Sequence, residues 1–215
     1  KYFKEYTFHK LYKELLNFCS LDLSAFYFDI RKDVLYCDEI KSTKRQICIN
    51  LLGLILDMLL KWFAPILSFT TEEIFQIINQ EKNSSIHLQI FPDVPSKWEN
   101  VKLFQKWNEL KKIRDVSNAA IEVKRSNKDI GSSLEAEVQI YLSKEYLELV
   151  KDVDLPEYFI TSKVEAKTTI NDDKLFQLDE MDNVKVLVKK AKGNKCSRCW
   201  KILQNPCERN NCGLK

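Results

Sequence analysis

Apolar residues recur at helical spacing through the first 80 residues of the chain. Phe8, Leu11, Leu15 and Phe18 lie three or four residues apart, which predicts a first helix with one buried face. From about Thr43 onwards, apolar side chains cover more than half of a helix circumference, which predicts a central helix packed on several sides. These side chains are Ile47, Leu51, Leu54, Ile55, Met58, Leu59 and Trp62.

Breaker and capping residues divide this region into a bundle. Pro65 is predicted to end the central helix, since proline cannot continue one. Thr70, followed three residues later by Glu73, forms a capping-box pattern that predicts the start of the next helix. Short connections between such helices are typical of a helical bundle.

A change of pattern follows near residue 84. The segment 86–95 carries Pro92 and Pro95 and predicts an extended crossover, and a long helix is expected from about Trp98 to Arg125. The apolar positions of that helix define its inner face. They are Phe104, Trp107, Leu110, Ile113, Val116, Ala120 and Val123.

Beyond Gly131 the pattern favours strands. Runs rich in β-branched and aromatic residues at 138–142, 157–161 and 184–188 predict strands, and 143–150 predicts a helix between the first two. The fold class is therefore mainly α: a helical bundle, a small α+β module and a cysteine-rich C-terminal tail. The predicted domains are 1–130, 131–192 and 193–215.

Composition restricts the class of protein. The 215 residues are 45% apolar and 30% charged, which excludes collagen-like, low-complexity and wholly disordered chains. The longest apolar run, 51–56, is broken by Asp57, so no transmembrane helix is expected. The first residues mix charged and aromatic side chains and do not resemble a secretory signal. We therefore expect a cytoplasmic protein with reduced thiols and no membrane partner.

The charge is uneven along the chain. The net charge is +3, yet residues 131–184 carry 5 basic and 13 acidic side chains, and residues 185–215 carry 9 basic and 1 acidic. A basic end behind an acidic stretch is typical of a segment that binds a polyanion, most often nucleic acid. The alternative is that lysine keeps a small terminal module soluble. Charge alone favours neither interpretation.

Four cysteines lie in the last twenty residues, as Cys196, Cys199, Cys207 and Cys212, with the spacing C-x2-C-x7-C-x4-C. Two closely spaced thiol pairs can hold one tetrahedral Zn²⁺, and metal binding would supply the folding free energy that so few apolar residues cannot. The alternatives are a disulfide framework and a tail that has lost its metal. Four thiolates leave no open position, so the ion would be structural.

Arg198 lies between the first two predicted ligands, and Trp200 follows the second. An arginine and an indole on a rigid metal loop could contact phosphate and stack on an unpaired base of RNA. Alternatively, Trp200 packs over the metal site as its core residue. The chemistry of the residues leaves both interpretations open.

No constellation for catalysis is visible. Cys19, Cys37 and Cys48 lie in apolar helical surroundings and are expected to be small core residues. Neither His9 nor His87 has a partner at the spacing of a triad or a metal site, and no glycine-rich phosphate loop is present. We therefore expect the chain to bind a partner and to have no catalytic residues of its own.

Several blocks of the sequence resemble one family. FHKLYKELLNFCSLDLSAFYFDIRKDVLYCD (8–38), SIHLQIFP (85–92), the run 107–114 with KRSNKDIGSSLEAEV (124–138), and KCSRCW (195–200) are similar, in order, to the C-terminal region of bacterial-type isoleucyl-tRNA synthetases. The first block and IGSSLEA favour the isoleucyl family over its valyl and leucyl relatives. One departure is that the family's second cysteine pair is usually CxxC after a longer linker.

The resemblance implies a function. The chain would be the tRNA-reading part of an enzyme that joins isoleucine to its tRNA, with the catalytic domain, its HIGH-type and KMSKS-type ATP motifs and the editing domain lying before residue 1. ATP would bind only in that missing domain, and the protein would be a monomer. Arg198 and Trp200 match positions that hold the anticodon stem-loop in the family.

Charge and helix face add further candidates for phosphate contacts, namely Arg31, Lys111, Lys112, Arg114 and Arg125. The competing hypothesis is a free-standing, zinc-stabilised module whose helices bind a protein partner.

Overall fold

The computed structural model describes residues 1–79, 84–169, 175–179, 181–205, 207 and 209. The chain forms two compact units. The first comprises Lys1–Leu35 and Ile40–Glu99, and the second comprises Tyr36–Glu39 and Asn100–Lys215. The three domains expected from the sequence stay a prediction.

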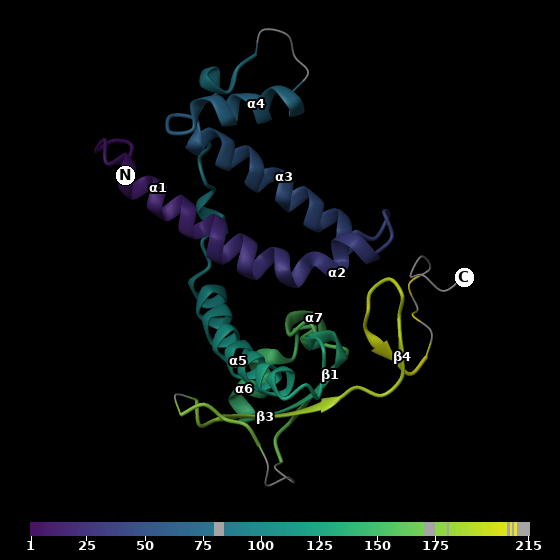
Figure 1. Ribbon diagram of the computed structural model, residues 1–215. Coiled ribbons are helices and arrows are strands. Elements are labelled where there is room, and N and C mark those ends of the chain that lie inside the picture. Colours follow the sequence, from purple (N-terminus) through teal and green to yellow (C-terminus); the bar gives the residue numbers. More distant parts are fainter. Residues whose placement is uncertain (80–83, 170–174, 180, 206, 208, 210–215) are drawn as a thin grey trace. The chain divides into compact units, whose positions relative to one another are not determined.

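The first unit is helical (Figure 1). Helix α1 (Phe8–Asn17) continues through the π-helix η1 (Phe18–Phe28) into α2 (Asp29–Cys37), and α3 (Thr43–Phe63) and α4 (Ser68–Ile78) follow. These bounds confirm the predicted helices and the end of α3 just before Pro65.

Helix α3 is not the central helix that its composition predicts. Only Cys48 and Leu60 are buried along it, because α4 and the turn η2 (Ile86–Leu88) are its main partners within this unit and meet its C-terminal part. The other apolar side chains of the helix are exposed or only partly buried. Among the described residues, α3 alone is long and apolar enough to span a membrane, with 21 residues and a mean hydropathy of 1.5 over an 18-residue stretch. A bundle helix can meet the same measure.

The start of α4 also differs from the prediction. The helix begins at Ser68, and its N-cap Leu67 makes no side-chain hydrogen bond. Thr71 instead donates its hydroxyl to the Leu67 carbonyl at 3.0 Å, and Glu72 accepts from the backbone N–H of Ile86 at 2.9 Å. The predicted capping box is therefore wrong. Glu72, which precedes the predicted Glu73, binds the loop that follows α4.

The crossover 86–95 is largely extended, as predicted, with η2 at its start and the 3₁₀ turn η3 (Ser96–Trp98) just beyond its end. Helix α5 (Val101–Ser126) then begins at its N-cap Asn100, whose side chain accepts a hydrogen bond from the backbone N–H of Leu103 at 2.9 Å. Its predicted inner face is buried from Leu110 to Ala120, whereas Phe104 and Val123 are exposed.

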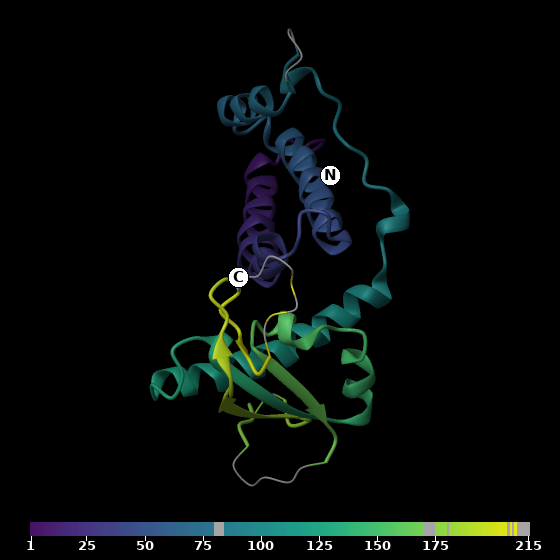
Figure 2. The same ribbon diagram turned by 90° about the vertical axis from the view of Figure 1, so that its right-hand side faces the viewer.

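A three-stranded sheet packs against α5 in the second unit (Figure 2). The strands β1 (Ala136–Leu142), β2 (Lys163–Lys167) and β3 (Val184–Lys190) lie in the order β2-β1-β3. Strand β1 is parallel to β2 and antiparallel to β3. Residues of both α5 and the sheet are completely buried where these layers meet, including Leu110, Ile113, Val138, Ile140 and Val184.

The crossover between β1 and β2 contains the helices α6 (Lys144–Val150) and α7 (Leu155–Tyr158). The predicted strand at 157–161 is therefore wrong. Asp154 caps the new helix by accepting from the backbone N–H of Glu157 at 3.3 Å, and Pro156 lies in its first turn, where proline is well tolerated. These local signals outweigh the aromatic run that predicted a strand.

The tail begins with a short antiparallel hairpin, β4 (Asn194–Lys195) and β5 (Ile202–Leu203). Gly193 precedes it with φ +139°, and a Cβ atom there would lie 2.2 Å from the carbonyl oxygen of Leu203. Only glycine allows this close approach. We call residues 194–203 the Cys hairpin.

Candidate metal centre and nucleic-acid interface

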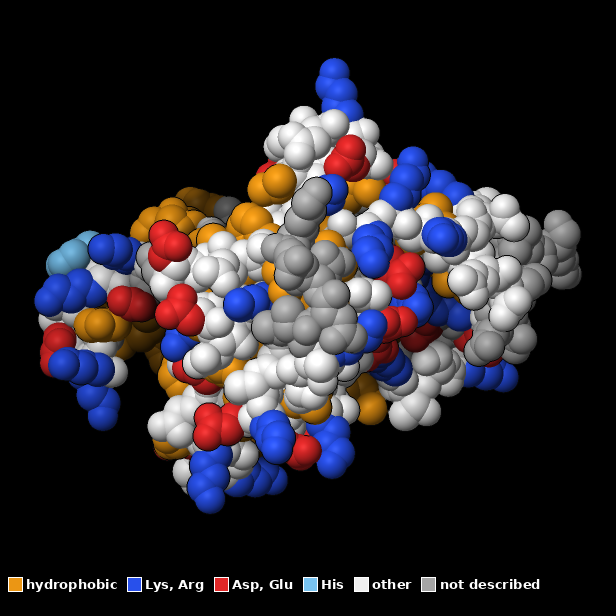
Figure 3. Space-filling model, turned by 90° about the horizontal axis from the view of Figure 1, so that it is seen from below, with side chains coloured by type: hydrophobic (Ala, Val, Ile, Leu, Met, Phe, Trp, Pro, Cys, Tyr) orange, Lys and Arg blue, Asp and Glu red, His pale blue; other side chains and the backbone are white. Residues whose placement is uncertain are grey.

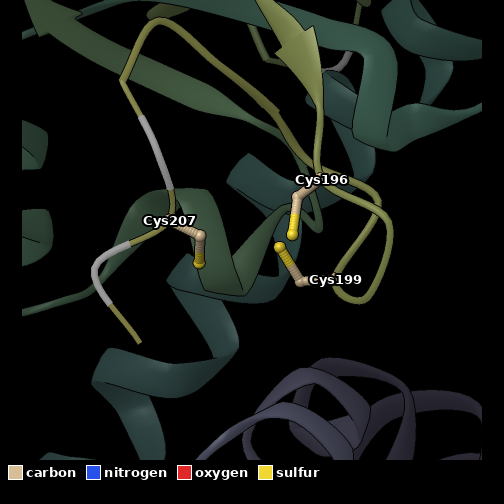
Figure 4. Close-up of side chains that lie close together, drawn as sticks. All are labelled: Cys196, Cys199 and Cys207. Carbon is tan, nitrogen blue, oxygen red and sulfur yellow. The ribbon is translucent and has the colours of Figure 1, made fainter. Parts of the chain in front are cut away.

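The Cys hairpin turns tightly between its two strands. The backbone N–H of Cys196 donates to the carbonyl of Lys201 at 2.9 Å, and that of Trp200 donates to the carbonyl of Cys196 at 3.0 Å. These bonds close a loop in which the second cysteine follows the first by three residues. The C-x2-C spacing therefore places both thiols on one side of the turn (Figure 4).

Three thiols converge at this turn. The sulfur atoms of Cys196, Cys199 and Cys207 all lie within 4.8 Å of one another, and the first two side chains are buried. Figure 4 shows Cys207 facing the hairpin from the chain that follows β5. Cys212, the fourth predicted ligand, lies outside the described residues.

The thiol triad of Cys196, Cys199 and Cys207 fits a metal ion. Zinc–sulfur bonds of about 2.3 Å in a tetrahedral site place ligand sulfurs roughly 3.8 Å apart, within the span that the triad shows. Thiolates are also soft ligands of the kind that select zinc among the abundant divalent ions. The arrangement can therefore hold a metal.

A fourth cysteine lies beside the triad. Cys37, at the end of α2, is 6% exposed as a core residue should be, but it packs with Cys196 and Cys199. Its Sγ donates to the carbonyl of Arg198 at 3.9 Å. The sequence gives no sign of this contact, because 161 residues separate the two partners.

The segment Tyr36–Glu39 makes two further contacts with the tail. The Nη2 atom of Arg198 donates to the carbonyl of Tyr36 at 2.8 Å, and Nε of Arg209 lies 3.1 Å from a carboxylate oxygen of Asp38. The guanidinium of Arg198 thus binds an end of helix α2, where backbone carbonyls lack helical partners. Arg198 therefore orients the loop between Cys196 and Cys199.

Trp200 does not form the core of this site. Its side chain is 60% exposed, whereas Leu203 and Cys207 pack against the buried cysteines. The interpretation that the indole packs over the thiols is therefore wrong. Its backbone also has φ +63°, a left-handed conformation that costs a residue with a Cβ atom about 1 kcal/mol or more. A strained, exposed aromatic residue on a rigid turn is typical of a contact surface.

The remaining RNA-binding candidates lie on other elements. Arg31 lies on α2 in the first unit, with its guanidinium carbon 5.8 Å from the ring centroid of Tyr27. Arg114 lies on α5, where Nε donates to the carbonyl of Tyr158 at 2.9 Å and the guanidinium covers the Tyr158 ring. Arg114 therefore helps to fix α7 against α5.

Two cations on α5 form ion pairs within their own helix. Lys112 lies 2.7 Å from Glu109, and Arg125 lies 2.7 Å from Glu122. The hydrogen bond from Lys112 lowers the pKa of the Glu109 carboxyl, and the same contact raises the pKa of Lys112. Lys111 is half-buried beside them. On the face shown in Figure 3, Lys and Arg side chains are interspersed with acidic ones.

The edge strand β2 carries an alternating ion-pair ladder. Glu165 lies 2.6 Å from Lys163 and 2.9 Å from Lys167. Hydrogen bonds from Lys163 and then Lys167 lower the pKa of Glu165 to about 2. Lys163 also lies 3.2 Å from Glu137 of β1, so its ammonium group is held between two carboxylates.

Comparison with known proteins identifies the family to which the chain is similar. A family model described as the anticodon-binding domain of tRNA ligase matches residues 1–140. The isoleucine–tRNA ligase of Pelagibacter ubique (strain HTCC1062) is 53% identical over 208 residues, which cover 97% of this chain and 22% of that protein. That of Bradyrhizobium diazoefficiens is 43% identical over 88% of this chain and 19% of its own length.

The chain spans about a fifth of the length of the curated relatives it matches. These relatives confirm the resemblance to isoleucyl-tRNA synthetases, and the family model covers well over half of the chain. The chain belongs to the anticodon-binding domain family of tRNA ligases.

Proposed function

We propose that this chain binds the anticodon arm of an isoleucine tRNA as part of an isoleucine–tRNA ligase. The observation that carries the proposal is the exposed indole of Trp200, whose backbone adopts a left-handed conformation in a turn next to three converging thiols. The family match and the isoleucine–tRNA ligase relatives name the nucleic acid.

The tail would hold a structural Zn²⁺ through Cys196, Cys199 and Cys207, with Cys212 as the predicted fourth ligand. The ion would supply the folding free energy of a segment with few apolar residues. With the turn fixed, Trp200 can stack on an unpaired base without first losing conformational entropy.

Positively charged residues would hold the phosphates of the arm. Lys111, Lys112, Arg125 and Arg31 are proposed for this role. The ion pairs of Lys112 with Glu109 and of Arg125 with Glu122 would open to exchange a carboxylate for a phosphate. Arg114 and Arg198 have structural partners, so we assign them the orientation of α7 and of the hairpin turn. Orientation of the turn is how Arg198 would support RNA binding.

Aminoacylation with ATP would be performed by the parts of the ligase that this chain does not span. We expect no ATP–pyrophosphate exchange by the chain alone, and activity in that assay would overturn this division of labour. The ligase would be a cytoplasmic monomer with no membrane partner, so α3 would pack as a bundle helix. Recovery of the chain in the membrane fraction after a carbonate wash would contradict that placement.

The function is tested by titrating the zinc-loaded chain with an isoleucine tRNA anticodon-arm hairpin. Loss of stacking in Trp200→Ala should weaken binding by about 1 to 3 kcal/mol, and Trp200→Phe should retain most of the affinity. Trp200→Gly is a second variant, because glycine accepts the φ of +63° without strain and so preserves the turn. Equal affinity in the unmodified chain and in all three Trp200 variants would contradict the proposal.

A second candidate is a module that binds a protein through α3. The exposed apolar side chains along this helix, including Ile47, Leu51 and Leu54, favour it. A hairpin titration separates the two hypotheses: replacing Leu51 and Leu54 by Gln should leave RNA affinity unchanged if the anticodon arm binds at the Cys hairpin. An intact chain with no affinity for the hairpin would favour the protein-binding module.

A further inference from the structure

Cys37 lies beside the thiol triad although it is far from it in the sequence. It ends helix α2, and the segment Tyr36–Glu39 belongs to the same compact unit as the Cys hairpin. Its side chain forms one buried cluster with Cys196 and Cys199, against which Cys207 also packs. The structure thus brings four of the seven cysteines of the chain together.

The backbone on both sides of Cys37 is fixed to the tail. The carbonyl of Tyr36, the preceding residue, accepts a hydrogen bond from Arg198 at 2.8 Å. The carboxylate of Asp38, the following residue, pairs with Arg209 at 3.1 Å. Each of these arginines lies within two residues of a cysteine of the thiol triad. Cys37 is therefore held next to the triad by contacts that do not involve its own side chain.

The sulfur of Cys37 contacts the loop that carries the first two thiols of the triad. It donates to the carbonyl of Arg198 at 3.9 Å, and it is not one of the sulfurs that lie within 4.8 Å of one another. A thiol is a weak hydrogen-bond donor, so this contact costs little to give up. A change of cysteine rotamer moves the sulfur by roughly 3 Å, so the side chain can turn without movement of the backbone.

The thiol triad alone leaves a tetrahedral ion one ligand short. The sequence offers Cys212 for the fourth position, five residues after Cys207, whereas the first two cysteines of the triad are three residues apart. The tight turn that brings those two thiols together therefore has no equivalent in the spacing of the second pair. Cys37 needs no such turn, because its neighbours on both sides are bound to the tail.

The charge of the tail suits a fourth thiolate. Zn²⁺ with four thiolates carries two net negative charges, and a buried charge needs compensation. Residues 185–215 carry 9 basic and 1 acidic side chains. These basic surroundings favour an anionic fourth ligand over a neutral one such as water.

We propose that Cys37 is the fourth ligand of the metal held by the thiol triad, in the position that sequence spacing assigns to Cys212. The proposal rests on the metal site of the proposed function and adds a ligand from outside the tail. On binding, the thiol loses its proton to solvent, and its sulfur exchanges the Arg198 carbonyl for the metal. The competing role for Cys37 is that of a small core residue that packs against the site without touching the metal.

The test counts the thiolate ligands of the loaded chain. In the chain loaded with Co²⁺, the thiolate-to-metal charge-transfer absorption grows with the number of bound thiolates, and zinc affinity is measured against a competing chelator. Cys37→Ala is compared with Cys212→Ala. The matched control is Cys48→Ala, which removes a buried cysteine of α3 that is outside the cluster.

We expect Cys37→Ala to lose about a quarter of the charge-transfer intensity and to bind zinc about a hundredfold more weakly, since one of four ligands is lost. Cys212→Ala and the control should keep both the intensity and the affinity of the unmodified chain. Cys37→His should recover much of the affinity, with the spectrum of three thiolates and one imidazole. A histidine can bind zinc, whereas a core role gives it no advantage over alanine.

Two results would overturn the proposal. Unchanged intensity in Cys37→Ala would show that Cys37 is a core residue, and a loss confined to Cys212→Ala would assign the fourth position to Cys212. If Cys37→Ala does not fold, as hydrogen exchange of the β1 and β3 amides would reveal, the spectrum of Cys212→Ala decides. Four thiolates in that variant support the proposal, and three overturn it. An unmodified chain that binds no metal would instead show that the metal site of the proposed function is wrong.

Discussion

The sheet and the Cys hairpin belong to the same unit but are stabilised by different forces. In the sheet, Val138, Ile140 and Val186 are at most 1% exposed and pack in a continuous apolar layer with α5. The hairpin has two paired residues in each strand, and its most buried side chains are cysteines. Apolar burial can stabilise the first region, whereas the second has few apolar residues, so we expect its stability to depend on a metal held by the thiols.

Metal removal should produce the largest difference in stability between the two regions. Structural zinc binding contributes about 10 to 16 kcal/mol in small domains, far more than the few hydrogen bonds of the hairpin. After chelation, or in Cys199→Ser, the amides of Cys196 and Trp200 should lose their protection from hydrogen exchange. The amides of β1 and β3 should keep theirs. Equal protection of the hairpin in protein shown to be metal-free would contradict this difference.

A core substitution should destabilise the sheet and leave the metal site of the hairpin unchanged. Ile113 is completely buried between α5 and the sheet, so Ile113→Ala should lower the free energy of unfolding by about 2 to 5 kcal/mol. Val101→Ala, at an exposed position of the same helix, should change it by less than about 0.5 kcal/mol. Urea titration gives both values. Zinc content should be equal in the two variants, and a loss of zinc in Ile113→Ala would show that the regions are not independent.

A substitution that strains the backbone tests the hairpin without changing a thiol. In Gly193→Ala the new Cβ would lie 2.2 Å from the Leu203 carbonyl oxygen, and the residue would keep an unfavourable φ of +139°. Such strain costs on the order of 1 to 3 kcal/mol. Zinc affinity, measured with a competing chelator, should fall about tenfold or more. The same affinity as the unmodified chain would mean that the hairpin can shift without cost.

The ion-pair ladder on β2 should give the smallest effect. The pKa of Glu165 lies near 2, below its ordinary value, so its stabilisation is present above about pH 4.5 and is lost as the pH falls towards 2. Between pH 6 and pH 3, Glu165→Gln should therefore lose less stability than the unmodified chain. Glu148→Gln, at an exposed glutamate on α6, is the control and should follow the unmodified chain. Acid affects the thiols of all three proteins equally. Comparing the change in stability of each variant with that of the unmodified chain therefore cancels this effect.

Much of the second unit could be predicted from the sequence because local patterns set it. The apolar runs predicted β1 and β3, and helical periodicity predicted α5 and α6. Strand β2 was missed because its sequence, KVEAK, alternates charge with small apolar residues and lies on the sheet edge. An edge strand needs little apolar surface, so its sequence carries a weak signal.

The candidate site shows a similar limit. Cysteine spacing predicted that Cys196, Cys199 and Cys207 group together, and the structure brings their sulfur atoms within 4.8 Å of one another. The exposure of Trp200 and the position of Cys37 could not be predicted, because both depend on contacts between residues far apart in the sequence. The same is true of α3, whose composition predicted burial that its unit does not provide.

The contacts of Tyr36–Glu39 have a consequence for biosynthesis. The partners of this segment, Arg198 and Arg209, are made more than 160 residues after it. At translation rates of about 5 to 20 residues per second, the segment waits roughly 10 to 30 s for them. The contacts between this segment and the tail can therefore form only after the intervening residues have been synthesised.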